Sequence, residues 1–191
     1  MEIYHRSCLK MKFQSGILLF AVTIISLCGA ELAVNWQESL KVTPPGAAVV
    51  KGWRLNNIRK SPKIGTGEVI EENGVKYFKI ETTGLDTNFH TTRNFPAQAG
   101  DTLEIEVTAQ GKGHLVVSCC CYQTDKKFFV PVNNKIQYII PKGEKKTWTI
   151  RKKLTDGKKG EKLGLITLTL GAGGKSSFAI YDYKAKIVKS K

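Results

Sequence analysis

Two carboxylates stand at a spacing that suits glycoside hydrolysis. Glu104 and Glu106 occupy alternate positions of one segment, and in a β-strand two residue rises separate such side chains by about 7 Å. Glycosidases use carboxyl groups at a comparable separation, but theirs flank the scissile bond from facing elements. Both glutamates would project in parallel from one strand. We therefore predict that they are solvated and that the chain is not an enzyme.

Other catalytic motifs are incomplete. No Ser, His and Asp set accompanies a nucleophile elbow, and His90 and His114 suit ordinary surface or loop positions. Gly174-Lys175-Ser176 resembles the end of a phosphate-binding loop. However, Thr169 stands where that motif requires its first glycine, and a strand pattern follows in place of a helix. We predict a turn there.

Three consecutive cysteines, 119–121, have ligand chemistry for a thiophilic metal. Neighbouring strand residues point to opposite faces, so Cys119 and Cys121 share one face and Cys120 takes the other. A zinc site needs further ligands at loop-like spacing, and after residue 30 the only histidines are His90 and His114. We predict no metal site, and we expect Cys119 and Cys121 to be small core residues.

The cysteines and glutamates lie in one segment, 100–122, with the period-two alternation of half-buried strands. Apolar residues alternate with polar ones on both sides of a turn at Gly111-Lys112-Gly113, and they are Leu103, Ile105, Val107, Ala109, then Leu115, Val117, Cys119, Cys121. We predict two strands that form an antiparallel hairpin with one buried face.

Similar short strand patterns fill the rest of the chain. Asn73-Gly74 predicts a hairpin turn between flanking strands. Residues 128–132 and 136–140 suggest a strand pair joined across Asn133-Asn134. About ten strands, with little helix, predict one all-β domain, an antiparallel β-sandwich or jelly roll, over residues 31–191.

Residues 1–30 have the features of a secretory signal peptide. Lys10 and Lys12 form a basic start, 16–27 is apolar, and small residues precede Glu31. The apolar run is shorter than the roughly 20 residues that span a bilayer. We predict cleavage after Ala30, a mature chain with no integral membrane segment, and a secreted or periplasmic location.

The chain is strongly basic, with a formal net charge of +14 at pH 7. The excess concentrates between Lys142 and Lys162, and a field of this sign attracts anionic partners. The aromatic residues are not interleaved with the basic run, as they would be in a single-strand binder, so no nucleic acid partner is expected. Anionic polysaccharide or an envelope surface suits an exported protein, and a merely solvated edge is the alternative.

The chain from residue 31 resembles the jelly-roll carbohydrate-binding modules of the family 4, 9 and 22 type, which have a galactose-binding-like fold. The matching motifs, in order, are Gly52-Trp53, Phe95-Pro96, Gly100-Asp101, Gly111-Lys112-Gly113, Trp148 and the closing segment 171–182. The resemblance implies a β-sandwich that binds carbohydrate. Members often hold a structural calcium through an Asp-Asp pair, of which only Asp182 is present. No cofactor is predicted, and calcium is left open.

Sugar sites need exposed aromatic rings with planar polar groups beside them. If Leu103 and its companions face the core, outward residues include Glu106 and, on the next predicted strand, Tyr122. Tyr77 takes the outward face of the strand that carries Phe78. We predict that Tyr77, Glu106 and Tyr122 line one carbohydrate-binding groove. The alternative is that the tyrosines only cap the sandwich edge.

These observations predict an exported, monomeric, non-catalytic protein that binds polysaccharide or glycan, with a preference for acidic sugars. A structural or adhesive envelope protein that uses its basic face for surface or protein contacts is the competing class. A lyase or hydrolase with an unrecognised site is a third, weaker hypothesis.

Overall fold

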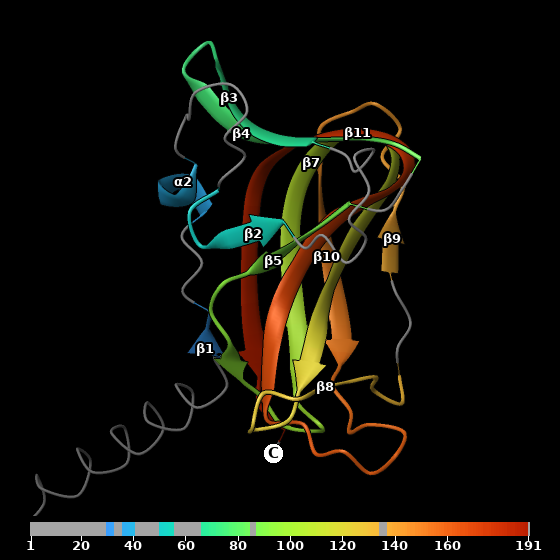
Figure 1. Ribbon diagram of the computed structural model, residues 1–191. Coiled ribbons are helices and arrows are strands. Elements are labelled where there is room, and N and C mark those ends of the chain that lie inside the picture. Colours follow the sequence, from blue (N-terminus) through green and yellow to red (C-terminus); the bar gives the residue numbers. More distant parts are fainter. Residues whose placement is uncertain are drawn as a thin grey trace, which may run out of the picture.

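The described part of the chain folds into antiparallel strands and one short helix (Figure 1). The computed structural model describes residues 30–32, 36–40, 50–55, 66–84, 87–133 and 137–190. Residues 1–29 of the predicted leader (1–30) lie outside the described part, and Ala30 belongs to β1. The elements are β1 (Ala30–Glu31), α2 (Trp36–Ser39), β2 (Trp53–Leu55), β3 (Thr66–Glu72), β4 (Val75–Thr83), β5 (Thr87–Thr91), β6 (Phe95–Pro96), β7 (Thr102–Tyr122), β8 (Phe128–Phe129), β9 (Gln137–Ile139), β10 (Lys146–Lys153) and β11 (Leu165–Val188). The all-β prediction is confirmed.

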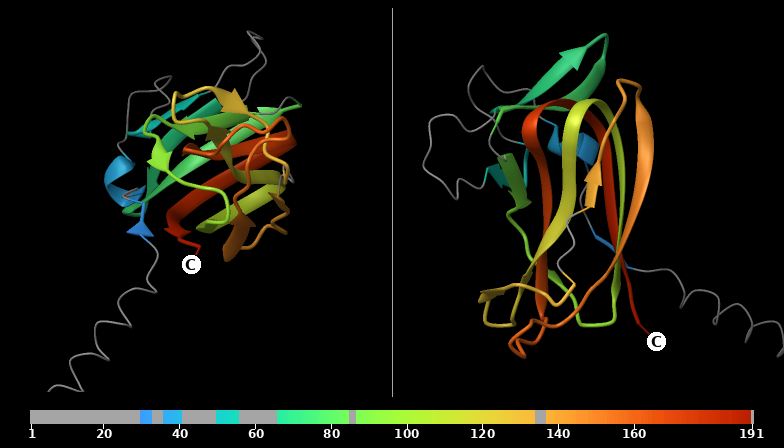
Figure 2. Two further views of the ribbon diagram at one scale, coloured as in Figure 1. Left: turned by 90° about the horizontal axis from the view of Figure 1, so that it is seen from below. Right: turned by 90° about the vertical axis from the view of Figure 1, so that its right-hand side faces the viewer.

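Two strands, β7 and β11, run through the whole molecule. They contain 21 and 24 residues and pair antiparallel from Tyr122 with Leu165 to Thr102 with Val188. Both bend at the same place, and the register between them shifts between Gly173 and Ser177. Figure 2 shows the two strands arching over together.

The bend divides the sheet into two layers (Figure 2). In the first layer, β10, residues 102–110 of β7, residues 177–188 of β11, β4 and β3 lie side by side. In the second layer, residues 114–122 of β7 and 165–173 of β11 lie between β9 and β5, and β2 pairs with β5.

The predicted hairpin within 100–122 is therefore wrong in its pairing. The chain does turn at Gly111–Gly113, but the two arms of β7 pair with β11 and not with each other. The predicted pair 128–132 with 136–140 is also wrong. β8 pairs with β7 at Cys121 and Tyr122, whereas β9 pairs with it around Val116.

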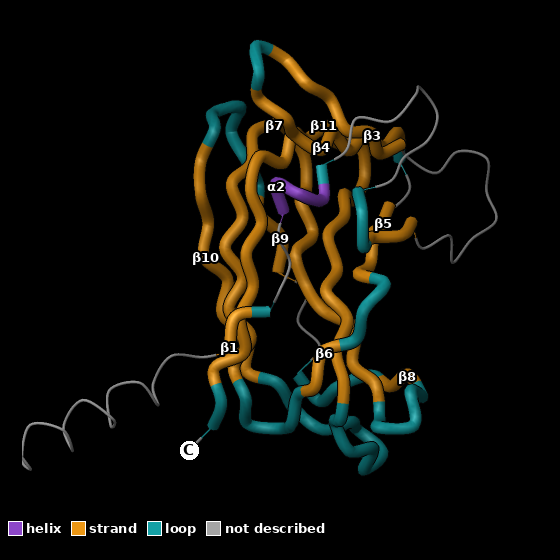
Figure 3. Tube along the Cα trace, turned by 90° about the vertical axis from the view of Figure 1, so that its left-hand side faces the viewer, coloured by secondary structure: helices purple, strands orange, loops and turns teal. Residues whose placement is uncertain are grey.

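A single core fills the space between the layers. The inward side chains of both β7 arms, Cys119 and Cys121 included, are buried there, as predicted. On the open side (Figure 3), α2 lies against the sheet, and its Trp36 is buried. Its ring packs edge-on against Trp53 of the second layer and Phe78 of the first, with centroids 6.0 and 6.2 Å apart. Such aromatic contacts add to the area that each ring buries.

Local turns agree with the sequence in part. Asn73 and Gly74 both have positive φ, 52° and 75°, which is the turn that suits a two-residue hairpin. It connects β3 to β4, so that prediction is confirmed. His114 is exposed as expected. His90 is not a surface residue, because it lies within β5 and is buried.

Glycine is required where the long strands bend together. Gly111 has a φ of 147°, and a Cβ there would collide with the Ser177 carbonyl oxygen and come within 2.8 Å of the Phe178 Cα. We expect Gly111→Ala to lower the free energy of unfolding by about 3 kcal/mol or more, since backbone strain and steric overlap add. Urea unfolding followed by circular dichroism would measure this.

Gly160 provides the matched control. Its φ is 83°, but a Cβ there meets nothing within 4 Å. Gly160→Ala should cost only the left-handed backbone penalty, about 1 kcal/mol. Equal effects of the two substitutions would contradict the idea that close approach of the strands decides the bend.

Candidate functional site

Two of the three predicted site residues lie on the outward face of the first layer. Tyr77 projects from β4, where its neighbour Phe78 points into the core. Glu106 projects from β7 between the buried Ile105 and Val107. The strand alternation predicted from the sequence therefore orients both side chains correctly.

Tyr122 lies elsewhere. It ends the second arm of β7, so its outward direction belongs to the second layer and points away from that of Glu106. Its ring packs edge-on against that of Phe128, with centroids 5.8 Å apart, and Phe128 is 60% exposed. The structure thus separates the three residues between two surfaces. The single groove was inferred from a hairpin that does not form.

Tyr181 takes the central place on the first-layer face. The register of β11 against β7 shifts between Ile180 and Asp182, and such a bulge changes which side chains face outward. Tyr181 and Asp182 are both partly exposed, whereas Ile180 and Tyr183 are buried. The ring of Tyr181 lies against that of Tyr77, with centroids 5.3 Å apart.

Polar groups surround the Tyr181 ring. Its hydroxyl donates to Gln110 Oε1 at 3.2 Å, and Gln110 Nε2 donates to the Gly143 carbonyl at 3.0 Å. Lys145 Nζ lies 3.9 Å from the ring centroid, a cation–π contact. Tyr181 lies in the closing segment 171–182, and only the bulge shows that its ring faces outward.

The Tyr77 ring packs against the Tyr181 ring on its protein side. Only 9% of its surface is exposed, so its ring offers little area to a ligand. Burial, a hydrogen bond to Glu72 and the Glu72 charge raise the pKa of Tyr77 to about 12. The hydroxyl is therefore held by the protein, and the ring serves as a fixed base for Tyr181.

Glu106 belongs to a ladder of ion pairs along the same face. Its Oε1 lies 3.9 Å from Lys184 Nζ, which also lies 3.2 Å from Asp182 Oδ2. Glu104 is bridged by Arg151 at 3.4 Å and by Lys186 at 3.3 Å. The two glutamates thus lie on one strand with cationic partners. The Glu106 side chain is 48% exposed, whereas that of Glu104 is 17% exposed.

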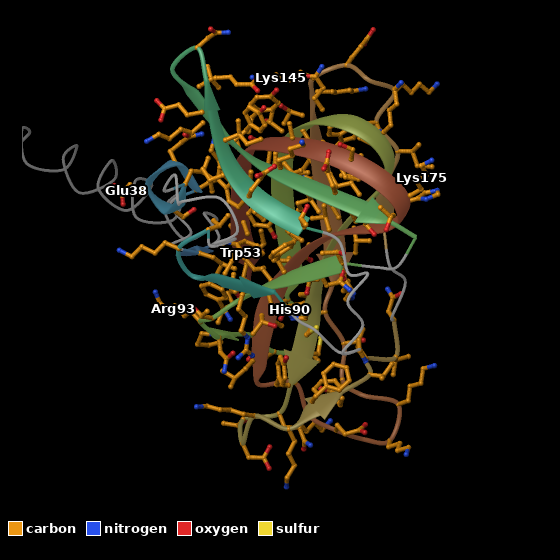
Figure 4. All side chains as sticks on the ribbon, turned by 45° about the horizontal axis from the view of Figure 1, so that its top comes forward. Glu38, Trp53, His90, Arg93, Lys145 and Lys175 are labelled. Carbon is orange, nitrogen blue, oxygen red and sulfur yellow. The ribbon has the colours of Figure 1, made fainter. Side chains whose placement is uncertain are left out.

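The bent end of the molecule carries unpaired positive charge. Five lysines that make no ion pair with any residue the structure describes gather there, and we call them the bend lysines: Lys112, Lys142, Lys145, Lys146 and Lys175. The turn before β10 is fastened to the bend by the Gly143 N–H, which donates to the Gly111 carbonyl at 3.1 Å. Figure 4 shows Lys145 and Lys175 at this end.

The predicted basic segment 142–162 is thus divided by the fold. Lys142, Lys145 and Lys146 join the bend lysines. Lys162 lies beyond the other end of β10 and binds Asp156 at 2.7 Å. Lys152 is buried, with its Nζ pointing inward and without a hydrogen-bond partner.

No metal cluster emerges in the described part of the chain. Three or more His, Cys, Asp or Glu side chains nowhere come together there as they would around an ion. Asp182, the one match to the calcium-binding pair of the resembled modules, accepts from the Tyr183 N–H at 2.9 Å and pairs with Lys184. Among the same residues, no helix has the length and apolarity needed to cross a membrane.

Comparison with known proteins adds the fold relationship. No protein-family model matches the sequence, and no curated protein matches it either. The N-terminal CBM22-1–CBM22-2 tandem domain of Paenibacillus barcinonensis Xyn10C aligns with 85% of this chain and 47% of its own, at a TM-score of 0.50 and 9% identity. The fold is one that carbohydrate-binding modules use.

Enzyme domains share it as well. A cyclase from Fischerella sp. TAU has a TM-score of 0.52 and 12% identity, over 85% of this chain and 99% of that one. The enzymatically active domain of bacteriophage CBA120 tailspike protein 4 has a TM-score of 0.54 and 10% identity over 82% of this chain. This chain spans 24% of that tailspike chain. The fold alone does not decide between binding and catalysis.

The ionisation of the Tyr77 hydroxyl can be measured by ultraviolet absorption. We expect the ultraviolet difference between the parent and Tyr77→Phe to titrate near pH 12, because the folded protein raises the pKa of Tyr77 to about 12 from the ordinary 10.0. A raised pKa stabilises the fold below pH 10, and that contribution disappears between pH 10 and 12. A difference spectrum that titrates near pH 10 would contradict the buried, hydrogen-bonded placement.

Proposed function

We propose that this protein binds acidic polysaccharide without catalysis, on the outward face of the first layer beside the bend. The observation that carries the proposal is the partly exposed Tyr181 ring, which lies against Tyr77 and next to Gln110 and Lys145. The fold relationship to carbohydrate-binding modules supports it.

The aromatic part suits a sugar ring. Pyranose faces present C–H groups that pack on aromatic rings, while hydroxyls at the rim need hydrogen-bond partners. Because Tyr77 fixes the tilt of Tyr181, little side-chain entropy is lost when a ligand packs there. Gln110 offers an amide to a neighbouring hydroxyl, and Lys145 can swing from the ring face to an anionic group.

The charged part suits uronate or sulfate. Lys145 is next to the ring, and the other bend lysines extend the positive surface across the bend. Hydrogen bonds between ammonium and an anionic oxygen are stronger than neutral ones. Glu106 is held by Lys184, so it can accept a hydroxyl hydrogen bond while its charge is partly balanced. We propose Tyr77 and Glu106 as supporting members of this site.

The non-catalytic part of the proposal rests on the carboxylates. Glu104 and Glu106 project from one strand and are in ion pairs with lysine or arginine. A glycosidase requires two carboxyl groups that flank the scissile bond, whereas these two project in parallel from one strand. We further propose that residues 1–30 export the protein to a periplasm or beyond the cell, where polysaccharides are exposed.

Replacing the exposed ring tests the site. We expect Tyr181→Ala to lower affinity for an acidic polysaccharide at least tenfold, about 1.4 kcal/mol, with little change in the melting temperature. Affinity electrophoresis through polyuronate or sulfated gels would measure it. Tyr122→Ala is the matched control, since Tyr122 lies on the other surface. Loss of binding with Tyr122→Ala alone would move the site to the Tyr122–Phe128 surface.

The bend lysines should act through charge. We expect Lys112→Gln with Lys145→Gln to weaken acidic ligands at low salt and to leave neutral ones unchanged. Exposed charges are screened within about 10 Å at 0.1 M salt. Lys158→Gln with Lys159→Gln removes the same charge beyond the other end of β10 and is the control. Equal losses from the two pairs, with every polyanion bound alike and released by salt, would favour an envelope protein that adheres through its basic surface.

A further inference from the structure

Apolar side chains gather on the surface at the end of the sandwich opposite the bend, where β8 lies (Figure 1). Phe128, Val130 and Val132 are 60%, 43% and 60% exposed, whereas the alternating Phe129 and Pro131 are buried. The three exposed side chains therefore project outward together, and we call them the apolar strip. They are three of the five large apolar side chains that are strongly exposed in the described part of the chain. Ordinary surfaces expose such residues singly.

The protein already satisfies much of the backbone beneath the apolar strip. β8 pairs with the end of β7, and the loop between β10 and β11 runs beside the rest of the strip. There the Lys158 N–H donates to the Val130 carbonyl at 3.4 Å, and the Val132 N–H donates to the Asp156 carbonyl at 2.9 Å. Backbone groups that are bonded within the protein can leave water at little cost. The strip is thus suited to a surface that excludes water.

Lysines lie on both sides of the apolar strip. Lys126 is in the turn that leads into β8, and Lys158 and Lys159 are in the loop beside Val130. All three lysines are exposed and make no ion pair with any residue in the described ranges. The strip therefore has a positively charged rim.

The carboxylates of the same two loops leave positive charge in excess. Asp125 pairs with Lys127 at 2.9 Å, and Asp156 pairs with Lys162 at 2.7 Å. Glu161 is the third carboxylate of these loops, and it accepts a backbone N–H of its own loop. Three lysines therefore remain against one carboxylate, and the rim attracts an anionic surface.

A lipid surface fits this chemistry better than a sugar or a second protein. The Tyr122 and Phe128 rings meet edge-on at 68°, so they offer no flat platform for a pyranose. A stable protein interface uses about 20–30 residues a side, far more than the strip provides. A bilayer interface needs only a few apolar side chains and attracts lysine through anionic headgroups. Tyrosine is enriched at that depth.

We propose that the apolar strip inserts into the headgroup region of a bilayer that contains anionic lipid, with Lys126 and Lys158 at the headgroups. Burial of Phe128 and its neighbours supplies an affinity that resists salt, and the lysines supply a part that salt screens. The bend lies at the other end of the sandwich (Figure 2), so the bound protein directs it away from the membrane. This inference does not depend on the proposed function.

Hydroxyl-radical footprinting can locate the contact in the parent chain. Because the apolar run 16–27 would bind lipid by itself in an unprocessed chain, the readout must be local to the strip. We expect vesicles of phosphatidylglycerol and phosphatidylcholine to reduce modification of Phe128 at least fivefold, and vesicles of phosphatidylcholine alone to protect it much less. Tyr181, beside the bend, should stay as reactive as in the free protein.

A tryptophan in the strip makes the affinity measurable. With the parent signal subtracted, the emission of Phe128→Trp should be quenched by lipid with brominated acyl chains. In this background, Lys126→Gln with Lys158→Gln should raise the lipid concentration for half-maximal quenching at least tenfold. The reason is that each lysine near an anionic surface contributes roughly a fivefold factor. Lys112→Gln with Lys175→Gln removes the same charge at the bend and is the matched control.

The apolar contribution has its own pair of variants in the same Phe128→Trp background. Val132→Ser should raise the half-maximal lipid concentration about fivefold, because an inserted apolar side chain is lost. Val75→Ser is the control, since Val75 is 48% exposed but lies at the start of β4. Melting curves would show that both variants stay folded, as expected for exposed positions.

Several results would overturn the proposal. One is equal modification of Phe128 with and without anionic vesicles. A second is loss of all protection at about 1 M salt, where exposed charges are screened within about 3 Å, and a third is an equal effect of the two lysine pairs. Either would describe adsorption through net charge. A dimer that Phe128→Ser dissociates in sedimentation velocity would assign the strip to a second copy of the chain.

Discussion

The close approach of β7 and β11 at their common bend is the constraint on which the rest of the structure depends. At Gly111 a side chain would overlap the backbone of β11 around Ser177, so only glycine lets both strands turn while they stay hydrogen-bonded. Without the turn, the pair would be a long ribbon with one apolar face in water. With it, each strand supplies both layers, and the apolar face closes on itself as a core.

The same bend sorts the chemistry of the chain onto opposite surfaces. Glu106 in the first arm of β7 and Cys120 in the second arm occupy the same alternate positions of the strand pattern. From the sequence alone, their side chains would therefore be placed on one face. The arms belong to different layers, so their outward directions diverge. Aromatic and cationic groups therefore gather around Tyr181 on the outward side of the first layer. Cys120 lies beside His90 on the outward side of the second layer.

Alternation predicted the buried faces well because burial of every second residue follows directly from strand geometry. The inward-facing residues of 103–109 and 115–121 are buried as expected: Leu103, Ile105, Val107, Ala109, Leu115, Val117, Cys119 and Cys121. Alternation does not name a strand's neighbour, so the partnership of β7 with β11 could not be predicted. Tyr181 was missed for a related reason: one bulge residue shifts the parity of β11, and local sequence gives no sign of that insertion. The burial of His90 could not be predicted either, because it depends on which elements cover β5.

The basic segment 142–162 shows that a cluster of charges in the sequence need not form one charged surface. The basic segment 142–162 is continuous in sequence, but the eight residues of β10 carry the chain roughly 26 Å along the sandwich. This exceeds the screening length of about 8 Å at physiological salt, so the lysines at the two ends of β10 act as independent patches. Net charge can accelerate the encounter with a polyanion. Of the lysines in this segment, Lys145 is the one that contacts the Tyr181 ring, so the proposed site draws on one end of the segment only.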